Sequence, residues 1–259
     1  RTSKKKHTVI VMGLFSKKRD KQIVYKIQKF VLEIIIKRID TFIFLGKGEY
    51  ELASKMFPKY IEKFKFVPFG INLNFWKTNV NYVNRSNDYI LFVGNDGNRD
   101  IDKVIKIGNS LKDVNIKIIT SHPINTEIKN DNIEVIYGNW NSNALSDESL
   151  KKYYENSILT FLPLKESFQP SGQSVTLQSM SLGIPVVITK TNGFWDIDNF
   201  NHLENIIFME DNHLDNWINV LSSLIKDRDL LNQISRNSII TVREKYDQID
   251  FFAELEALI

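Results

Sequence analysis

The sequence predicts an α/β fold made of two parallel-sheet units joined by a linker. Short apolar runs alternate along the chain with longer stretches in which apolar residues recur every three or four positions, the order of a strand–helix–strand protein. The early elements carry no hairpin signal, which favours parallel pairing of the strands. A length of 259 residues, with 42% hydrophobic and 25% charged residues, is that of a globular protein with one large or two modest domains.

The first unit begins with an apolar run that ends in glycine, HTVIVMG over 7–13, which predicts a buried strand. An amphipathic helix is predicted over 17–38. Its apolar positions are spaced three and four apart and are expected to face the core: Ile23, Val24, Ile27, Phe30, Val31, Ile34 and Ile35. A strand over 41–45, a helix over 48–57 that stops near Pro58, and a strand over 64–68 follow.

The second unit follows a stretch rich in Asn, residues 69–88, in which the periodicity breaks. We predict strands over 89–94, 114–120, 133–137, 158–164, 186–189 and 206–209. Helices are predicted over 101–111, 146–154, 174–182, 215–225, 230–246 and from 250 onward. The predicted division is a first domain over 1–72, a linker over 73–88, a second domain over 89–240, and a carboxyl-terminal helix over 241–259 that packs back on the first domain.

Composition excludes several kinds of chemistry. Cysteine is absent, so the chain has no disulfide, no thiolate metal site and no thiol nucleophile, which fits a reducing, cytoplasmic setting. The apolar runs are far shorter than the roughly 20 residues of a membrane span, and no secretory signal is recognised. The four histidines are scattered without ligand spacing, so no metal site is predicted.

Positive charge gathers at the amino end. Residues 1–40 hold twelve Lys and Arg against three acids, about +9, whereas the whole chain carries +3. A solvated surface is the first interpretation, peripheral contact with an anionic membrane at its inner face is the second, and nucleic acid is the third. Because no nucleic-acid motif or interleaved aromatic residue is present, we predict no nucleic-acid partner.

The most informative stretch for function is Leu162–Thr189, LPLKESFQPSGQSVTLQSMSLGIPVVIT. A predicted strand ends, an irregular loop holds Gly172, and a helix begins near Gln173. The first-turn amides of a helix lack internal partners, and the helix dipole adds positive charge there, so such an end binds phosphate. A helix start that binds nothing is the alternative interpretation.

Four ordered motifs resemble one enzyme family. LQSMSLGIPVVIT is similar to the LEAMAxGxPVVxT signature of retaining GT-B glycosyltransferases, the large family-4 (group 1) type. VPFGIN over 67–72 resembles that family's interdomain linker VPNGVD. ILFVGNDGNRDID over 90–102 resembles FVGRxxxxKGxD, and TNGFWDI over 191–197 resembles TxxGGxxEI. The resemblance spans roughly residues 40–245 and implies a fold of two Rossmann-like units, with the first incomplete in this chain.

The resemblance also implies site residues. Gly94 ends the first donor-domain strand, and the family's Arg after FVG is Asn95 here, which removes one cationic clamp on the diphosphate. Arg99 aligns with the family's Lys, and its guanidinium fork suits phosphate oxygens. The loop and helix start supply the remaining diphosphate contacts: Ser171, Gly172, Gln173 and Ser174.

The family's Glu-x7-Glu pair is not preserved. Gln178 takes the place of the second Glu, which accepts hydrogen bonds from the donor's ribose, and Pro170 takes the place of the first. Glu166 is a candidate catalytic group four residues upstream, with a solvated loop residue as the alternative. We interpret these departures as a variant site rather than as decay.

Two tryptophans and two acidic pairs have competing interpretations. Trp140 either stacks on the nucleotide base or fills the cleft wall, and Trp195 either lines the sugar pocket or packs its loop. The pairs Asp100/Asp102 and Asp196/Asp198 are expected to be a helix start and a loop rather than a metal–diphosphate motif.

The resemblance implies transfer of a sugar from a nucleotide diphosphate sugar to a hydroxyl acceptor, with retention and without a cofactor. The acceptor would be a glycan, a lipid-linked molecule or a small molecule, in cell-envelope or exopolysaccharide synthesis. A nucleotide-sugar binding module without turnover and a GT-B-like epimerase are the alternatives. The first unit holds only its later strands, so the acceptor loops are expected upstream of Arg1.

Overall fold

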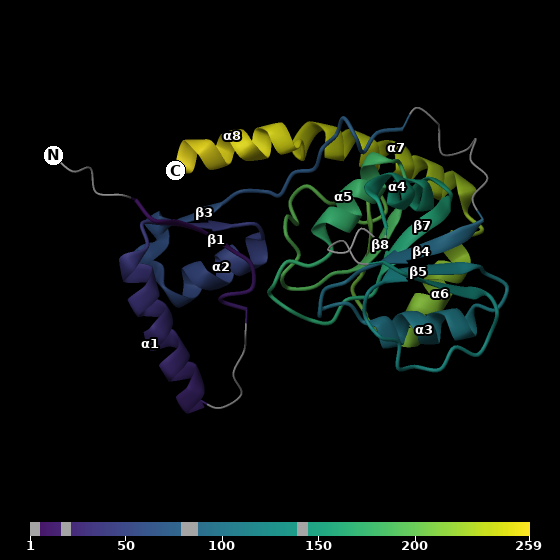
Figure 1. The fold of residues 1–259 in the computed structure, drawn as a ribbon, viewed down its shortest axis with the longest axis horizontal. Helices are drawn as coiled ribbons and strands as arrows, with labels where there is room; N and C mark the ends of the chain where they lie inside the picture. The colour runs from purple at the N-terminus through teal and green to yellow at the C-terminus, as the bar shows by residue number, and fades with distance from the viewer. Residues whose placement is uncertain (1–5, 17–21, 79–87, 139–144) are drawn as a thin grey trace.

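The computed structural model describes residues 6–16, 22–78, 88–138 and 145–259, and it contains two sheets whose strands all run parallel (Figure 1). The small sheet has the order β1-β2-β3, with β1 at Thr8–Val11, β2 at Thr41–Phe44 and β3 at Phe64–Phe66. The large sheet has the order β6-β5-β4-β7-β8-β9. Its strands are β4 (Tyr89–Val93), β5 (Ile116–Thr120), β6 (Ile133–Tyr137), β7 (Ser157–Leu162), β8 (Val186–Thr189) and β9 (Ile207–Met209). The predicted α/β class is confirmed.

The large sheet is buried on both faces by helices. Strands β4, β7 and β8 are buried along their whole length, which explains why they are continuous apolar runs in the sequence. The flanking helices are α3 (Ile101–Ser110), α4 (Asp147–Glu155), α5 (Gln173–Ser181), α6 (Leu214–Leu224) and α7 (Arg228–Lys245). Helix α3 packs beside α6, and α5 packs beside α7. The predicted element positions are confirmed, with ends that shift by one or two residues.

Local signals set several helix ends as predicted. Ser146 accepts a hydrogen bond from the amide of Ser149 and so caps α4. Gly183 follows α5 with a φ of +72°, the left-handed conformation that glycine adopts without strain. Helix α2 (Lys47–Met56) ends before Pro58, and a 3-10 helix over Pro58–Lys63 that the sequence analysis did not predict follows it.

The small sheet packs aromatic residues on one face and a distant helix on the other. Helix α1 (Gln22–Arg38) and α2 cover a cluster built around the rings of Phe15, Phe42, Phe44 and Phe64. On the other face, α8 (Gln248–Leu258) places Leu255 against Ile43, Leu45 and Val67. Figure 1 shows α8, in yellow, crossing from the large unit to the small one.

The predicted core-facing side of α1 is wrong. The buried residues of this helix are Leu32 and Ile36, and all seven apolar positions predicted to face the core are exposed. Apolar residues occupy most of the circumference of α1, so the periodicity by itself did not distinguish its inner side from its outer side. Residues 17–21, where we predicted the helix to begin, lie outside the described residues.

The two units meet at the amino end of α2. The amide of Lys47 donates to the carbonyl of Trp195 (2.8 Å), and the Lys47 ammonium pairs with Asp198. The chain between the units runs beside the start of α8, because Ile71 exchanges backbone hydrogen bonds with Tyr246 and Gln248 at 2.9 Å each. The division into domains at 72 and 88 remains a proposal. Within the described residues, no helix is long and apolar enough to cross a membrane.

Gly48 lies at this junction without room for a side chain. A Cβ there would collide with the carbonyl oxygen of Asn192 and lie 3.0 Å from the Cα of Gly193, both backbone atoms that cannot rotate away. Gly48→Ala is therefore expected to lower the free energy of unfolding by about 1–3 kcal/mol, as overpacking does, when measured by urea titration. Gly97→Ala is the matched control, because a Cβ there meets nothing within 4 Å; equal effects from the two variants would contradict the tight junction.

Candidate anion-binding site

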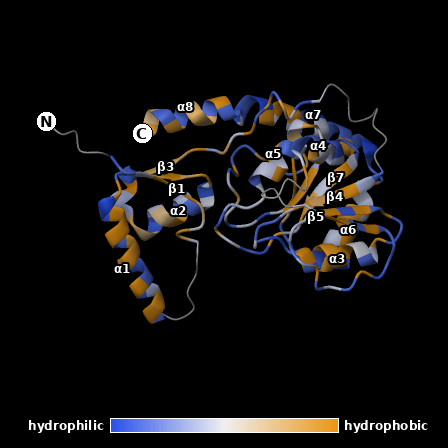
Figure 2. Ribbon diagram, in the orientation of Figure 1, coloured by the Kyte–Doolittle hydropathy of each residue, from blue (hydrophilic) through white to orange (hydrophobic). Residues whose placement is uncertain are grey.

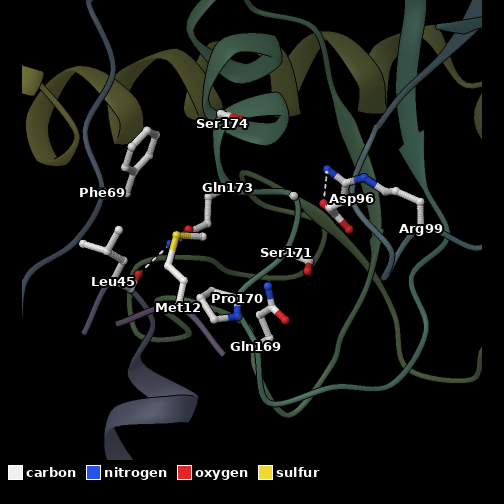
Figure 3. A pocket seen from close by; sticks show the side chains of 11 residues that line it. Met12, Leu45, Phe69, Asp96, Arg99, Gln169, Pro170, Ser171, Gln173 and Ser174 are labelled. Carbon is white, nitrogen blue, oxygen red and sulfur yellow. Dashed lines mark hydrogen bonds and ion pairs between the residues drawn. The ribbon is translucent and has the colours of Figure 1, made fainter. Parts of the chain in front are cut away.

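A pocket opens where the carboxyl ends of the small sheet's strands face the loop before α5 (Figure 3). Its apolar wall is made by Met12, Leu45 and Phe69, each of which follows a strand of the small sheet. Its opposite wall, which carries the polar side chains, comes from the large unit: Asp96, Arg99, Gln169, Pro170, Ser171, Gly172, Gln173 and Ser174. Ligands bind at this end of open parallel sheets, so the location is that expected of a functional site.

Helix α5 begins inside this pocket. Gly172 is its N-cap residue with a φ of +86°, a conformation that favours glycine, and no side chain caps the helix. The first-turn amides therefore keep their hydrogen-bonding capacity, and the helix dipole adds positive potential at the same point. An anion in the pocket would meet both.

Arg99 supplies a cation beside this helix start. The residue is only 5% exposed, and its Nε and Nη1 have no hydrogen-bond partner. A Cβ on Gly172 would lie 3.1 Å from Nη1 of Arg99, so the guanidinium lies next to the helix N-terminus. Burial lowers the pKa of Arg99, and the nearby Asp96 carboxylate opposes that shift. A buried cation with unused donors is costly unless an anion pairs with it, so these atoms point to an anionic ligand.

The loop that carries Arg99 is fixed against the end of β7. The amide of Asp100 donates to the carbonyl of Pro163 (3.0 Å), and the amide of Lys165 donates to the carbonyl of Asn98 (2.8 Å). Gly94 makes room for the arginine, because a Cβ there would overlap the Arg99 side chain. The position of the guanidinium is thus set by two backbone contacts and one glycine.

The structure gathers part of the predicted donor set in one place. Arg99, Ser171, Gly172, Gln173 and Ser174 line the pocket. The side-chain amide of Gln173 also donates to the carbonyl of Leu45 at 2.5 Å, which ties the start of α5 to the small unit. The Gln173 side chain therefore bonds to the other unit. The backbone amide of Gln173 still belongs to the first turn of α5.

Two other predicted site residues, Asn95 and Gln178, form hydrogen bonds with protein groups outside the pocket. The Asn95 side chain donates to the carbonyl of Gly138 (3.2 Å) and accepts from the amide of Ser121. The amide oxygen of Gln178 accepts from the hydroxyl of Tyr154 (3.3 Å). Neither residue lines the pocket, so their roles toward a donor stay predictions.

Glu166 lies on the exposed loop with its carboxylate on Asn192. One of its oxygens accepts from both the backbone and the side-chain amide of that residue, at 2.9 Å each. This contact holds two loops together, and the catalytic hypothesis for Glu166 stays a prediction. Trp140 lies outside the described residues.

Trp195 and the acidic residues Asp100 and Asp196 form contacts within the protein. Trp195 is fully buried and stacks on Phe194 with ring centroids 4.1 Å apart, so it packs its loop. Asp100 caps α3 through the amide of Lys103, as expected for a helix start. Asp196 is buried and accepts from the hydroxyl of Tyr246 (2.9 Å). In the described part of the chain, no group of three or more His, Cys, Asp or Glu is arranged to hold a metal.

Sequence reasoning missed the apolar wall and one acid of the pocket. Asp96 lies 3.3 Å from Nη2 of Arg99, three residues before it on the same loop. Its place three residues after the buried strand β4 is a signal that would have identified it. The positions of Met12, Leu45 and Phe69 just beyond three parallel strands would likewise have identified them.

Comparisons with solved structures identify the type of fold, whereas comparisons of sequence find no match. No family model and no curated protein matches this chain. The structure is similar to sucrose-phosphate synthase from Thermosynechococcus elongatus, with a TM-score of 0.74, 13% identity and coverage of 97% of this chain and 66% of that one. It is also similar to Anabaena HepE in complex with UDP-glucose, with a TM-score of 0.74, 12% identity and coverage of 97% and 72%.

One similar structure is a separately solved domain. The carboxyl-terminal domain of the group 1 glycosyl transferase LpcC from Francisella tularensis aligns over 69% of this chain and 99% of its own, with a TM-score of 0.54 and 16% identity. The fold is therefore that of GT-B glycosyltransferases. The chain spans about two thirds of the length of the sucrose-phosphate synthase it resembles.

The pairing of Asp96 with Arg99 generates a prediction about anion binding. In the wild type, the backbone amide of Asn98 donates to the Asp96 carboxylate at 2.9 Å. In Asp96→Asn, the side-chain oxygen at position 96 can still accept this hydrogen bond, but a negative charge leaves the pocket. The affinity for inorganic pyrophosphate, measured by calorimetry, should rise roughly fivefold, or about 1 kcal/mol. Asp215→Asn, an exposed position on α6, is the control for net charge. Weaker or unchanged pyrophosphate binding by Asp96→Asn would show that the carboxylate does not compete with the anion.

Proposed function

We propose that this chain binds a nucleotide diphosphate sugar and takes part in transferring the sugar to a hydroxyl acceptor. The observation that carries the proposal is the buried, partly unpartnered guanidinium of Arg99 beside the uncapped start of α5, inside a fold of the GT-B type. A diphosphate has the charge and the oxygen atoms to use both groups at once.

The chemistry would rest on stabilising the leaving group. Arg99 and the amides from Gly172 to Ser174 would hold the diphosphate as negative charge develops on it when the bond to the sugar breaks. Ser171 lies beside them, and its hydroxyl already accepts from the side-chain amide of Asn98 (2.8 Å). A preorganised site of this kind strengthens electrostatic contacts, because the donors do not need to reorient.

The remaining parts of the proposal come from the resemblance. Gly94 and Asn95 would border the donor, Gln178 would face its ribose, and Trp140 would stack on its base. The transfer would proceed with retention, without a cofactor or metal. HepE is known in complex with UDP-glucose, which makes UDP the first nucleotide to test.

The cellular setting is proposed on the same basis. We propose a cytoplasmic enzyme of cell-envelope or exopolysaccharide synthesis whose acceptor is a glycan, a lipid-linked molecule or a small molecule. Contact of the basic amino end with a membrane stays an alternative; salt-sensitive sedimentation with anionic vesicles would support it, and equal binding to neutral vesicles would argue against it.

A binding module without turnover is the second candidate, and one observation favours it. Pro170, which occupies the family's first acidic position, lies in the pocket wall and packs closely on Gly46, where a Cβ would lie 2.8 Å from the proline ring. Proline carries no group that could accept or donate a proton at this position. Release of UDP from UDP-glucose in the presence of an acceptor would distinguish an enzyme from a module that only binds. The epimerase alternative has no such observation in its favour.

Nucleotide binding is tested through Arg99. UDP titrated by calorimetry should bind wild type, and Arg99→Ala should weaken that binding at least tenfold, because a charge-assisted contact to the diphosphate is lost. Arg99→Lys keeps the charge without the fork and should give an intermediate affinity. Arg236→Ala, an exposed arginine on α7, should bind like wild type.

Circular dichroism of each variant separates lost binding from lost folding. Arg99→Ala that remains folded and binds UDP as wild type does would overturn the placement of the diphosphate. Absence of UDP and GDP binding to the wild type would overturn the nucleotide proposal itself.

Retention is tested by the product. With UDP-glucose, whose sugar is α-linked, the first glucoside formed should be the α-anomer when followed by proton NMR. Formation of the β-anomer would contradict the retaining assignment, while leaving the binding site unaffected.

A further inference from the structure

A buried carboxylate, Glu49, holds the loop that follows β1. This loop continues from a small sheet whose strands are largely apolar, drawn in orange in Figure 2. Glu49 lies in the first turn of α2 and is completely buried. One of its oxygens accepts from the amide of Gly13 (2.7 Å) and the other from the amide of Phe15 (2.9 Å). A buried carboxylate is costly unless hydrogen bonds compensate it, so these two bonds fix the loop.

Gly13, one of the two amide donors, lies against Gln169 of the large unit. A Cβ at Gly13 would lie 2.7 Å from Oε1 of Gln169 and 2.8 Å from its Cδ, so the side-chain amide touches the backbone of the glycine. Gly13 also has a φ of +85°, a conformation that favours glycine. The loop that Glu49 holds is therefore the surface on which the Gln169 amide rests.

Gln169 lines the anion-binding pocket with a side-chain amide that is not used within the protein (Figure 3). Its backbone amide donates to the hydroxyl of Ser167 (2.9 Å), whereas its side-chain amide forms no hydrogen bond with any other residue that the structure describes. The adjacent Pro170 has no polar side-chain group and packs on Gly46. Of these two neighbouring residues, Gln169 alone can offer a polar side-chain contact to a ligand.

The position of this amide indicates the ligand group that it would meet. In the proposed function, the diphosphate lies at Arg99 and the start of α5, and the sugar bonded to it lies in the same pocket. Gln169 is on the loop that leads into this helix start, three residues before Gly172. An amide both donates and accepts hydrogen bonds, which matches a sugar hydroxyl better than a phosphate oxygen, which only accepts. Apart from Asp96 and Arg99, the residues that line the pocket are uncharged.

We propose that Gln169 contacts a hydroxyl of the donor's sugar, and that Glu49 is a positioning residue that holds the loop over 12–15 against Gln169. The inference rests on the proposed function, because it takes the diphosphate as the neighbour of the sugar. Gln169 would set how strongly the sugar contributes to donor binding. Glu49 is buried, does not line the pocket, and would act only through the loop.

Calorimetry separates the sugar contact from the nucleotide contact. The probes are UDP-glucose with UDP, and GDP-mannose with GDP, and the pair that the wild type binds is used. In Gln169→Ala, affinity for the nucleotide sugar should fall about fivefold through loss of a neutral hydrogen bond, with less than about a twofold change for the free nucleotide. Gln233→Ala, an exposed position on α7, is the matched control and should bind both probes like wild type.

Glu49→Gln tests the positioning role. Its side chain keeps one acceptor oxygen, but its NH2 group faces the second backbone amide, so one of the two hydrogen bonds is lost. This variant should also bind the nucleotide sugar more weakly and spare the free nucleotide. Combined with Gln169→Ala, it should weaken binding no further, because Glu49 acts through Gln169. Glu51→Gln, an exposed position on the same helix, is the control.

A second variant reaches the same contact from the loop in case Glu49→Gln does not fold. In Gly13→Ala, the added Cβ would displace the Gln169 amide and should reproduce the selective loss of nucleotide-sugar binding. Hydrogen exchange of folded Glu49→Gln should be faster at the amides of Gly13 and Phe15 than in the wild type.

The possible failures are distinct. Equal losses of nucleotide and nucleotide-sugar affinity in Gln169→Ala, or no loss, would overturn the sugar contact. Additive losses in the double variant would overturn the positioning role of Glu49. A wild type that binds none of the four probes would overturn the proposed function, and this inference with it.

Discussion

Burial of the Arg99 guanidinium constrains the arrangement of the whole cleft. The loop that carries it is fixed to the chain after β7, and glycines after β4 and at the start of α5 leave room for the side chain. Gly94 has no side chain where the arginine passes, and Gly172 takes a left-handed backbone next to Nη1. Removing a cation from water is costly, so this packing makes physical sense if a negative ligand compensates the buried charge.

The same site joins the two units. Gln173 reaches the carbonyl of Leu45, Pro170 packs on Gly46, and the side chain of Gln169 lies against Gly13. All three partners lie directly after strands of the small sheet or one residue beyond. A ligand at the start of α5 would therefore contact a wall contributed by both units. Movement of one unit relative to the other would change the pocket's shape and its exposure to water.

The small unit is stabilised unevenly. Its centre is a cluster of aromatic rings, and its far face is closed by Leu255 from the carboxyl-terminal helix. A buried glutamate, Glu49, accepts from the amides of Gly13 and Phe15 at 2.7 and 2.9 Å and so holds the loop that follows β1. Burial raises the pKa of Glu49 despite these bonds. The outer edge lacks comparable cover, and its apolar side chains remain in water.

The sequence by itself determined the α/β class, the order of the elements and the start of helix α5 near Gln173. These depend on local periodicity, capping residues and glycine positions, which act over a few neighbours along the chain. Tertiary structure alone decided which side of α1 is buried, because that helix is apolar around most of its circumference. It also decided that Asn95 and Gln178 bond to neighbouring protein groups and do not line the pocket. Those outcomes depend on contacts between residues far apart in sequence, which no local pattern encodes.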